Sequence, residues 1–387
     1  MGTVTTNIPQ KSQRLVSLDA LRGFDMFWIM SGEGIIHALA KATNWPFFVW
    51  LSGQLHHTVW NGITFYDMIF PLFLFIAGVS TPYSLQKKIQ QAGVDHAKDL
   101  PWAAKKNIYL TMLKRTLILL LLGMVVNGLL KFNGYPNIRF ASVLGRIGLA
   151  WFFAGLIYLN FSTRGQAVWF AGLLLGYWAA MMLIPVPGYG AGVLTMDGSL
   201  ESYIDRLLLP GRLHDKIHDP EGVLSTIPAI GTALLGVFTG SFLQSGRPRL
   251  SMLQKSGIMA VAGLLLIGLG SLWNITFPIN KRLWTSSFVL YVGGFSLLFL
   301  TVFYVVVDVW SFKKWAQPFV WIGSNSILIY LCAEGLVNFG HTANALFGGI
   351  INQTPVVWQP VWQAASVTAI QLILLYWLYR KKIFFKI

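Results

Sequence analysis

The sequence predicts an all-α, polytopic membrane protein with about ten transmembrane helices and with both termini in the cytoplasm. Of its 387 residues, 55% are hydrophobic and only 11% are charged, whereas a soluble domain carries about 25% charged residues. The mean hydropathy is +0.59. The apolar residues form long continuous runs, which differ from the short alternating segments of a transmembrane β-barrel.

The apolar runs divide the chain into its expected elements, because each transmembrane helix needs roughly 20 residues. The expected spans are residues 17–40, 63–85, 108–131, 142–161, 166–186, 226–244, 255–275, 285–308, 317–337 and 360–380. We expect one transmembrane domain over residues 16–387, preceded by a cytoplasmic tail over residues 1–15. That tail lacks the apolar region and cleavage site of a signal peptide.

Basic residues indicate the orientation. With the N-terminus inside, most of the 29 Lys and Arg residues fall in cytoplasmic segments, as the positive-inside rule requires. The net charge of +15 is therefore attributed to topology, and no nucleic-acid partner is expected. We expect the cytoplasmic (inner) membrane of a bacterium.

A polar stretch lies directly before the span 63–85. His57, Asn61 and Asp67 occur there close together, next to an apolar run. A carboxylate so near lipid is costly and usually functional, although a loop histidine and a helix-capping aspartate would give the same pattern. The Thr64 and Asp67 spacing resembles a capping box. Because the span 17–40 runs outward, Glu33 is expected in the outer half of the membrane.

A long external loop is expected over about residues 187–225, and loops of this length are commonly functional or disordered. Its amphipathic stretch Tyr203–Leu209 favours order. The single cysteine, Cys332, excludes an intramolecular disulfide. No cluster with metal-ligand spacing and no phosphate-binding glycine motif occurs in the sequence, so neither a metal site nor a soluble nucleotide domain is expected.

Several motifs, in order along the chain from about residue 15, resemble the heparan-α-glucosaminide N-acetyltransferase family of transmembrane acyltransferases. These motifs are Ser17-Leu-Asp19-Ala-Leu-Arg22-Gly23, His57-x-x-Trp60-Asn61-Gly62-x-Thr64-x-x-Asp67, Arg139-x-x-x-Val143-Leu-x-Arg146, Tyr203-Ile-Asp205-Arg206, Asp219-Pro220-Glu221-Gly222, Gly323-x-Asn325-Ser326 and Tyr379-Arg380-Lys381-Lys382.

The resemblance implies acetyl-CoA as the cytoplasmic donor, an amino sugar as the external acceptor, and delivery of the acetyl group across the membrane. The essential histidine of the family maps to His57. This chain has Glu33 where the family commonly has asparagine, which suits a cationic acceptor. The luminal domain of the lysosomal relative has no counterpart in this sequence, so a lysosomal setting is not expected.

Roles follow from the resemblance together with general chemistry. His57 is the expected general base or acetyl carrier, and Glu33 and Asp67 assist it; the structural alternative pairs Glu33 with Arg146. The expected substrate-binding residues are Trp60, Asn61, Arg146, Asn325, Ser326 and Glu334. The expected CoA-binding residues are Arg22, Lys114, Arg115, Lys381 and Lys382. The bilayer is a partner, and a homodimer is a possibility.

Two other functions fit the same residues. The first is acyl transfer to a hydroxyl group of an envelope glycan, which needs a stronger base than transfer to an amine does. The second is a proton-coupled transporter of small molecules, with Glu33 and Asp67 as intramembrane proton sites.

Overall fold

The computed structural model describes residues 15–132, 134–245 and 250–385. The predicted cytoplasmic tail lies outside these residues, apart from Leu15. Throughout the described ranges the regular structure is helical, and the only β pairings are two isolated bridges, Arg139 with Gly211 and Val186 with Gly190. The all-α prediction is therefore confirmed.

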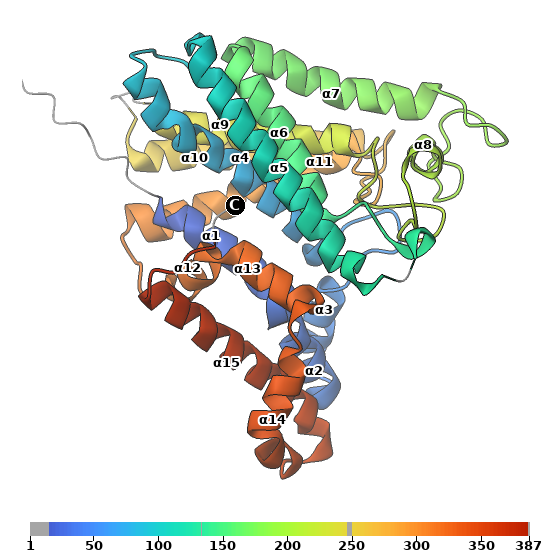
Figure 1. Cartoon of the computed structure of the whole chain (residues 1–387), viewed down its shortest axis with the longest axis vertical. Helices are drawn as coiled ribbons and strands as arrows, with labels where there is room; N and C mark the ends of the chain where they lie inside the picture. The colour runs from blue at the N-terminus through green and yellow to red at the C-terminus, as the bar shows by residue number, and fades with distance from the viewer. Residues whose placement is uncertain (1–14, 133, 246–249, 386–387) are drawn as a thin grey trace, which may run out of the picture.

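The helices form two groups (Figure 1). The larger group contains α4 (Phe65–Gln91), α5 (Trp102–Val126), α6 (Val143–Asn160), α7 (Thr163–Leu183), α9 (Thr226–Gln244), α10 (Met252–Trp273) and α11 (Ser286–Phe303). The smaller group contains α1 (Val16–Phe27), α12 (Gln317–Ser324), α13 (Ser326–Leu331) and α15 (Gln359–Arg380). Helices α2 (Glu33–Thr43), α3 (Pro46–Gln54) and α14 (Phe339–Asn352) project from the smaller group.

Within the described residues, eight helices are long and apolar enough to span a membrane, or nine if the bent pair α12 and α13 is one span. These helices agree with the prediction of about ten spans, and two of the predicted spans differ from a straight, uninterrupted α-helix. The span 317–337 bends by 75° between its two parts. The span 17–40 is helical but contains a π-helical turn at Trp28–Gly32 and has Asp19, Arg22 and Asp25 in its first half, which lowers its apolar character.

Helices α4 and α9 pack in close contact and hold the centre of the larger group. A Cβ added at Gly78 would collide with the carbonyl of Ala233, and one at Gly236 with the carbonyl of Phe75. Small residues at such positions let helix backbones approach closely inside a membrane. This contact fixes α4, whose first turn carries Asp67.

The first turn of α4 forms the capping box that the sequence predicts. Asp67 accepts hydrogen bonds from the backbone N–H groups of Thr64 (3.2 Å) and Thr58 (3.2 Å). The Gly62 N–H bonds to the Ile279 carbonyl at 2.9 Å, which ties this loop to the α10–α11 loop. These contacts place the predicted polar stretch at one end of the bundle.

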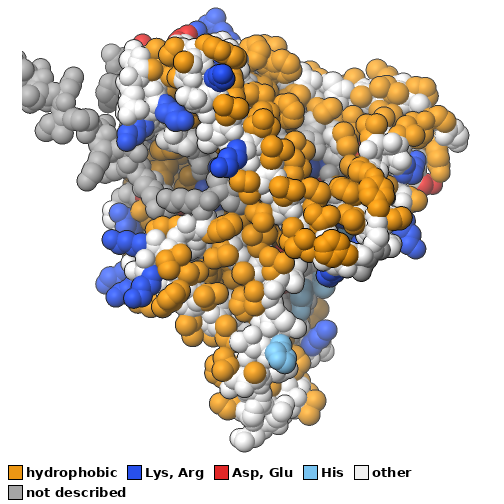
Figure 2. Space-filling view, in the orientation of Figure 1, with side chains coloured by type: hydrophobic (Ala, Val, Ile, Leu, Met, Phe, Trp, Pro, Cys, Tyr) orange, Lys and Arg blue, Asp and Glu red, His pale blue; other side chains and the backbone are white. Residues whose placement is uncertain are grey.

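Apolar side chains cover the helices on the face drawn in Figure 2, and most Lys and Arg side chains visible there lie on the left. The first turn of α1 and the last turn of α15 lie on that same side (Figure 1). This distribution is what the positive-inside rule expects of a cytoplasmic side. The cytoplasmic location of the termini stays a prediction. We refer below to this side as the basic side and to the opposite side as the loop side.

Candidate functional site

His57 lies in the loop between α3 and α4, on the loop side. Its Nδ1 is 2.8 Å from Asp67 Oδ1, and half of its side chain is exposed. Asp67 is fully buried. A carboxylate at this position accepts the Nδ1–H and leaves the lone pair of Nε2 available, as in a catalytic base held by an aspartate. The sequence-predicted pair of His57 and Asp67 is thus in direct contact.

Lys281, from the α10–α11 loop, completes this group and was not among the predicted site residues. Its Nζ lies 3.0 Å from Nδ1 and 3.3 Å from Nε2 of His57, and 3.5 Å from Asp67 Oδ1. Burial lowers the pKa of Lys281 below its ordinary value, and Asp67 offsets part of this effect. The available signal was a basic pair, Lys281 and Arg282, in a short loop on the side where basic residues are otherwise sparse.

Asn61 and Trp60 hold the loop that carries His57. The side-chain oxygen of Asn61 accepts a hydrogen bond from Asn280 Nδ2 at 3.1 Å, next to Lys281 in sequence. Trp60 Nε1 donates to the Leu194 carbonyl at 2.8 Å. These contacts position the loop, and the predicted substrate-binding roles of both residues stay predictions.

Two glutamates interact with Tyr66, whose ring contacts His57. The ring of Tyr66 lies 4.8 Å from the ring of His57, and its hydroxyl interacts electrostatically with Glu33 and Glu334. Glu33 begins α2, directly after the π-helical turn, and Glu334 lies in the π-helical turn that follows α13. The two predicted carboxylates come from distant parts of the chain and interact with each other.

Arg139 and two acidic residues border the site on the side of the long loop. Arg139 donates to Asp219 through Nε (2.8 Å) and Nη2 (2.6 Å), and it also bonds to Glu221. Burial alone would raise the pKa of Asp219, but these bonds hold it below its ordinary value. Glu221 is within electrostatic range of Lys281. Tyr330 interacts with Glu334, Glu221 and Arg139, so it links this group to the glutamates.

The long loop is ordered around α8 (Leu200–Leu208) and a buried polar cluster. Glu201 Oε2 lies 2.9 Å from His218 Nδ1, and neither side chain is exposed. Burial raises the pKa of Glu201 to about 8 and that of Asp205 to about 8, and it lowers the pKa of His218 to about 4. Trp60 stacks its ring edge-on at 5.4 Å from His218, so this cluster supports the His57 loop.

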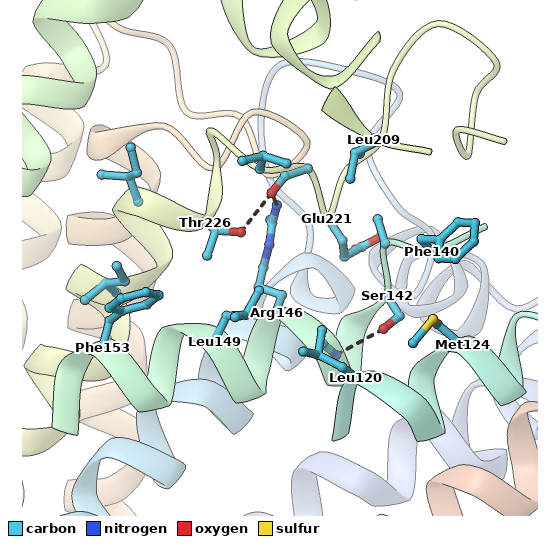
Figure 3. A pocket seen from close by; sticks show the side chains of 16 residues that line it. Leu120, Met124, Phe140, Ser142, Arg146, Leu149, Phe153, Leu209, Glu221 and Thr226 are labelled. Carbon is cyan, nitrogen blue, oxygen red and sulfur yellow. Dashed lines mark hydrogen bonds between the residues drawn. The ribbon is translucent and has the colours of Figure 1, made fainter. Parts of the chain in front are cut away.

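Arg146 is buried beneath the same loop. It donates to the Gly222 carbonyl and the Ser225 hydroxyl, and its guanidinium lies 5.0 Å from the centroid of the Trp284 ring. Figure 3 shows it extending from α6 toward the chain between Glu221 and Thr226. Within the described part of the chain no ion pair joins it to Glu33, so the structural alternative for Glu33 is not observed.

The predicted CoA-binding residues fall into two sets. Arg22 Nη2 donates to Ser80 Oγ at 3.0 Å, and it is within electrostatic range of Arg115, which stacks 4.6 Å over the Trp151 ring. The other residues of the prediction are exposed: Lys114, Lys381 and Lys382.

A small apolar gap of about 30 Å³ lies between α1, α4, α6 and α13. Met26, Phe73 and Ile147 line it, and so does Tyr330, which also interacts with the acidic groups around His57. Helix α1, which lines the gap, also carries Arg22, and helix α4, which lines it too, also carries Asp67.

Asn325 and Ser326 lie at the bend between α12 and α13, and both are buried. Asn325 Nδ2 donates to the Ile383 carbonyl at 3.0 Å, and its Oδ1 accepts from the Phe385 N–H at 2.8 Å. The amide thus binds the backbone that follows α15, on the basic side. A role in substrate binding stays a prediction for both residues.

Residues 14–275 match the family model described as "Heparan-alpha-glucosaminide N-acetyltransferase, catalytic". The human protein named heparan-alpha-glucosaminide N-acetyltransferase is 29% identical over 86% of this chain and 55% of its own length. The mouse protein of the same name is 28% identical over 86% of this chain and 56% of its own length. The chain thus spans about half the length of these relatives.

Proposed function

The chain belongs to the heparan-α-glucosaminide N-acetyltransferase family, and from this premise we propose that it is a transmembrane N-acetyltransferase. It moves an acetyl group from cytoplasmic acetyl-CoA to the amino group of a glucosamine-type sugar on the loop side, which we take as external. The observation that carries the proposal is the contact of His57 with Asp67 and Lys281. We place the enzyme in the cytoplasmic membrane of a bacterium.

The chemistry assigned to His57 has two forms. In direct transfer, Nε2 accepts a proton from the amine while the amine attacks the thioester carbonyl; the C–S bond breaks, and the thiolate leaves and takes up a proton. In the two-step form, Nε2 attacks first, the C–S bond breaks, and the thiolate leaves and takes up a proton. The amine then displaces the imidazole from the acetyl group, and the freed Nε2 takes the proton that the amine loses. In both forms we assign the Lys281 ammonium to donate a hydrogen bond to the developing oxyanion.

The charges around His57 support an amine acceptor. Glu33 and Glu334 lie near each other and near Tyr66, whose ring contacts His57. Two carboxylates attract the ammonium form of an amino sugar and hold it where His57 can take its proton. A hydroxyl acceptor would derive no comparable benefit from them.

The donor side of the proposal rests on Arg22 and Arg115. Guanidinium groups bind phosphate through paired, charge-assisted hydrogen bonds, and these two are within electrostatic range of each other. The gap between α1, α4, α6 and α13 holds only about 30 Å³, so these helices must separate before the pantetheine arm can approach His57.

A transporter is the second candidate, because a π-helical turn occurs at Trp28–Gly32 and a bend occurs between α12 and α13. Interrupted helices are common where transporters bind substrates and ions. Purified protein in detergent has no gradient across it, so it separates the two functions. We expect radiolabelled acetyl-CoA and glucosamine to give labelled N-acetylglucosamine and free CoA. If glucosamine is never acetylated while a glycan gains esters, the acceptor is a hydroxyl group; if no acyl transfer occurs, the enzyme proposal fails.

His57→Ala should lower kcat by about 10²–10⁴-fold, because the general base or acetyl carrier is removed. CoA binding, measured by isothermal titration calorimetry, should be retained. The matched control is His56→Ala: His56 is the exposed neighbour and stacks on His37 at 4.3 Å, so transfer should persist. Equal loss in both variants, or loss of CoA binding with the fold intact, would show that His57 has a structural or binding role.

A further inference from the structure

A cavity with a volume of about 520 Å³ lies between α5, α6, α9 and the long loop (Figure 3). Its walls are nearly all apolar, and the polar side chains among them are Ser142, Arg146, Glu221 and Thr226. A free sugar needs a hydrogen-bond partner for most of its hydroxyl groups, since burying them unpaired is costly. This cavity therefore suits a hydrocarbon chain.

The cavity runs from the loop side into the membrane region. On α6 it extends from the first turns to Phe153, and ten residues from Val143 correspond to about 15 Å of helix. That length is half of a hydrocarbon core of about 30 Å, or one leaflet. Phe153 is 43% exposed, and Leu121 on the neighbouring α5 is 55% exposed, so this part of the surface faces lipid.

The end of the cavity at the long loop leads toward His57 through charged groups. Glu221 lines the cavity, bonds to Arg139, and is within electrostatic range of Lys281, whose Nζ contacts the His57 ring. Together with Glu33 and Glu334, Glu221 gives this region the negative charge that complements an ammonium group. A molecule that has both an apolar chain and a cationic amine would place its chain in the apolar cavity and its amine in the acidic region.

We propose that the acceptor is an amino sugar carried on a membrane lipid of the external leaflet. Its apolar chain lies in the cavity between α5, α6 and α9, and its free amine reaches His57 past Glu221. The inference rests on the proposed function and specifies its substrate class. The pantetheine arm of CoA is a poor fit for this cavity, because CoA starts from the basic side and the cavity lies at the loop side.

The test compares two acceptors in nanodiscs: methyl and n-dodecyl 2-amino-2-deoxy-β-glucoside. Two variants narrow the cavity without touching the groups around His57, namely Val223→Trp and Leu149→Trp. Each should raise the KM for the dodecyl compound about ten-fold and leave turnover of the methyl compound unchanged, which also shows that the variants fold. Leu265→Trp on α10, where Leu265 is 63% exposed and lies outside the cavity, should change neither.

A second measurement needs no turnover. An alkyl glucosaminide with a photoreactive diazirine on its chain should label α6 and α9 near Leu149 and Ile230, and Leu149→Trp should reduce this labelling. Equal labelling of α10, or equal effects of Val223→Trp on both acceptors, would overturn the lipid-linked acceptor while N-acetylation of the methyl compound still supports the proposed function. If the wild type acetylates neither compound, the proposed function fails, and this inference fails with it.

Discussion

At the scale of single residues, Asp67 performs two tasks with one carboxylate. Oδ2 accepts the backbone N–H groups of Thr58 and Thr64, while Oδ1 faces His57 Nδ1 at 2.8 Å and Lys281 Nζ at 3.5 Å. The cap that starts α4 therefore also orients the imidazole. Because the helix is held by its packing on α9, the histidine is held as well.

Lys281→Met tests the residue that the sequence did not suggest. Removing an ammonium 3.0 Å from the imidazole takes away the cation that the proposal assigns to the developing oxyanion. The kcat should therefore fall by about 10²–10³-fold. The measurement is the initial rate of transfer at saturating acetyl-CoA and glucosamine.

Lys281→Arg serves as the control, since it keeps the charge and should retain most of the kcat. An equal loss of kcat in Lys281→Met and Lys281→Arg would contradict the electrostatic role. It would indicate instead that the lysine only supports the loop.

The residues of this site differ in how well a sequence can predict them. His57 and Asp67 are close in sequence and lie beside an apolar run, and Glu33 and Glu334 are carboxylates inside apolar runs, so the cost of burying them draws attention to all four. Lys281 is 224 positions from His57. It lies in a loop outside the apolar runs, where a lysine is common and does not draw attention. Only the packing of the α10–α11 loop on Gly62 and Asn61 makes it a neighbour.

At the scale of elements, hydropathy predicted where helices lie but not where they break. The run 317–337 is mostly apolar, yet the backbone bends at Asn325. The side chain of Asn325 bonds to the backbone of Ile383 and Phe385, which stabilises the bend. Gly335 has a φ of +117°, which ends the same segment. Such breaks depend on tertiary partners, and a window average over the sequence does not contain them.

The long loop offers an element-scale prediction about pH. The pKa of Glu201 is about 8 in the fold, above the ordinary value, so between these values the unfolded chain has lost a proton that the folded protein keeps. Stability then falls as pH rises, by about 1.4 kcal/mol per pH unit for one carboxyl group. His218, with a lowered pKa of about 4, is neutral in both states above its ordinary value and adds nothing there.

Glu201→Gln should therefore make the decline of the melting temperature between pH 6.5 and 8 shallower, as followed by intrinsic fluorescence, and Asp205, whose pKa is also about 8, should account for the slope that remains. Asp197→Asn is the matched control, because Asp197 is an exposed carboxylate of the same loop and should leave the slope unchanged. An unaltered slope in Glu201→Gln would mean that this carboxyl is ionised in the fold.

At the scale of the whole molecule, titratable groups gather at two sides with an apolar gap between them. His57, Lys281 and the glutamates lie on the loop side, Arg22 interacts with Ser80 and Arg115 toward the other, and the intervening gap holds only about 30 Å³. A site divided in this way lets two substrates approach from opposite compartments. A soluble acetyltransferase has no need of such a division.

Sidedness is the prediction that follows from this arrangement. In vesicles of uniform orientation, acetyl-CoA, which does not cross a bilayer, should support transfer only from the basic side, and glucosamine should be acetylated only on the loop side. Arg115→Gln should raise the KM for acetyl-CoA about ten-fold and leave the KM for glucosamine unchanged, because we propose that the lost guanidinium binds a phosphate group of CoA. Glu33→Gln should raise the KM for glucosamine about ten-fold and leave the KM for acetyl-CoA unchanged. Arg164→Gln, which removes an exposed arginine at the start of α7, controls for a general loss of positive charge. Transfer with both substrates on one side only would contradict a divided site, since no donor would then need to reach His57 through the gap between α1, α4, α6 and α13.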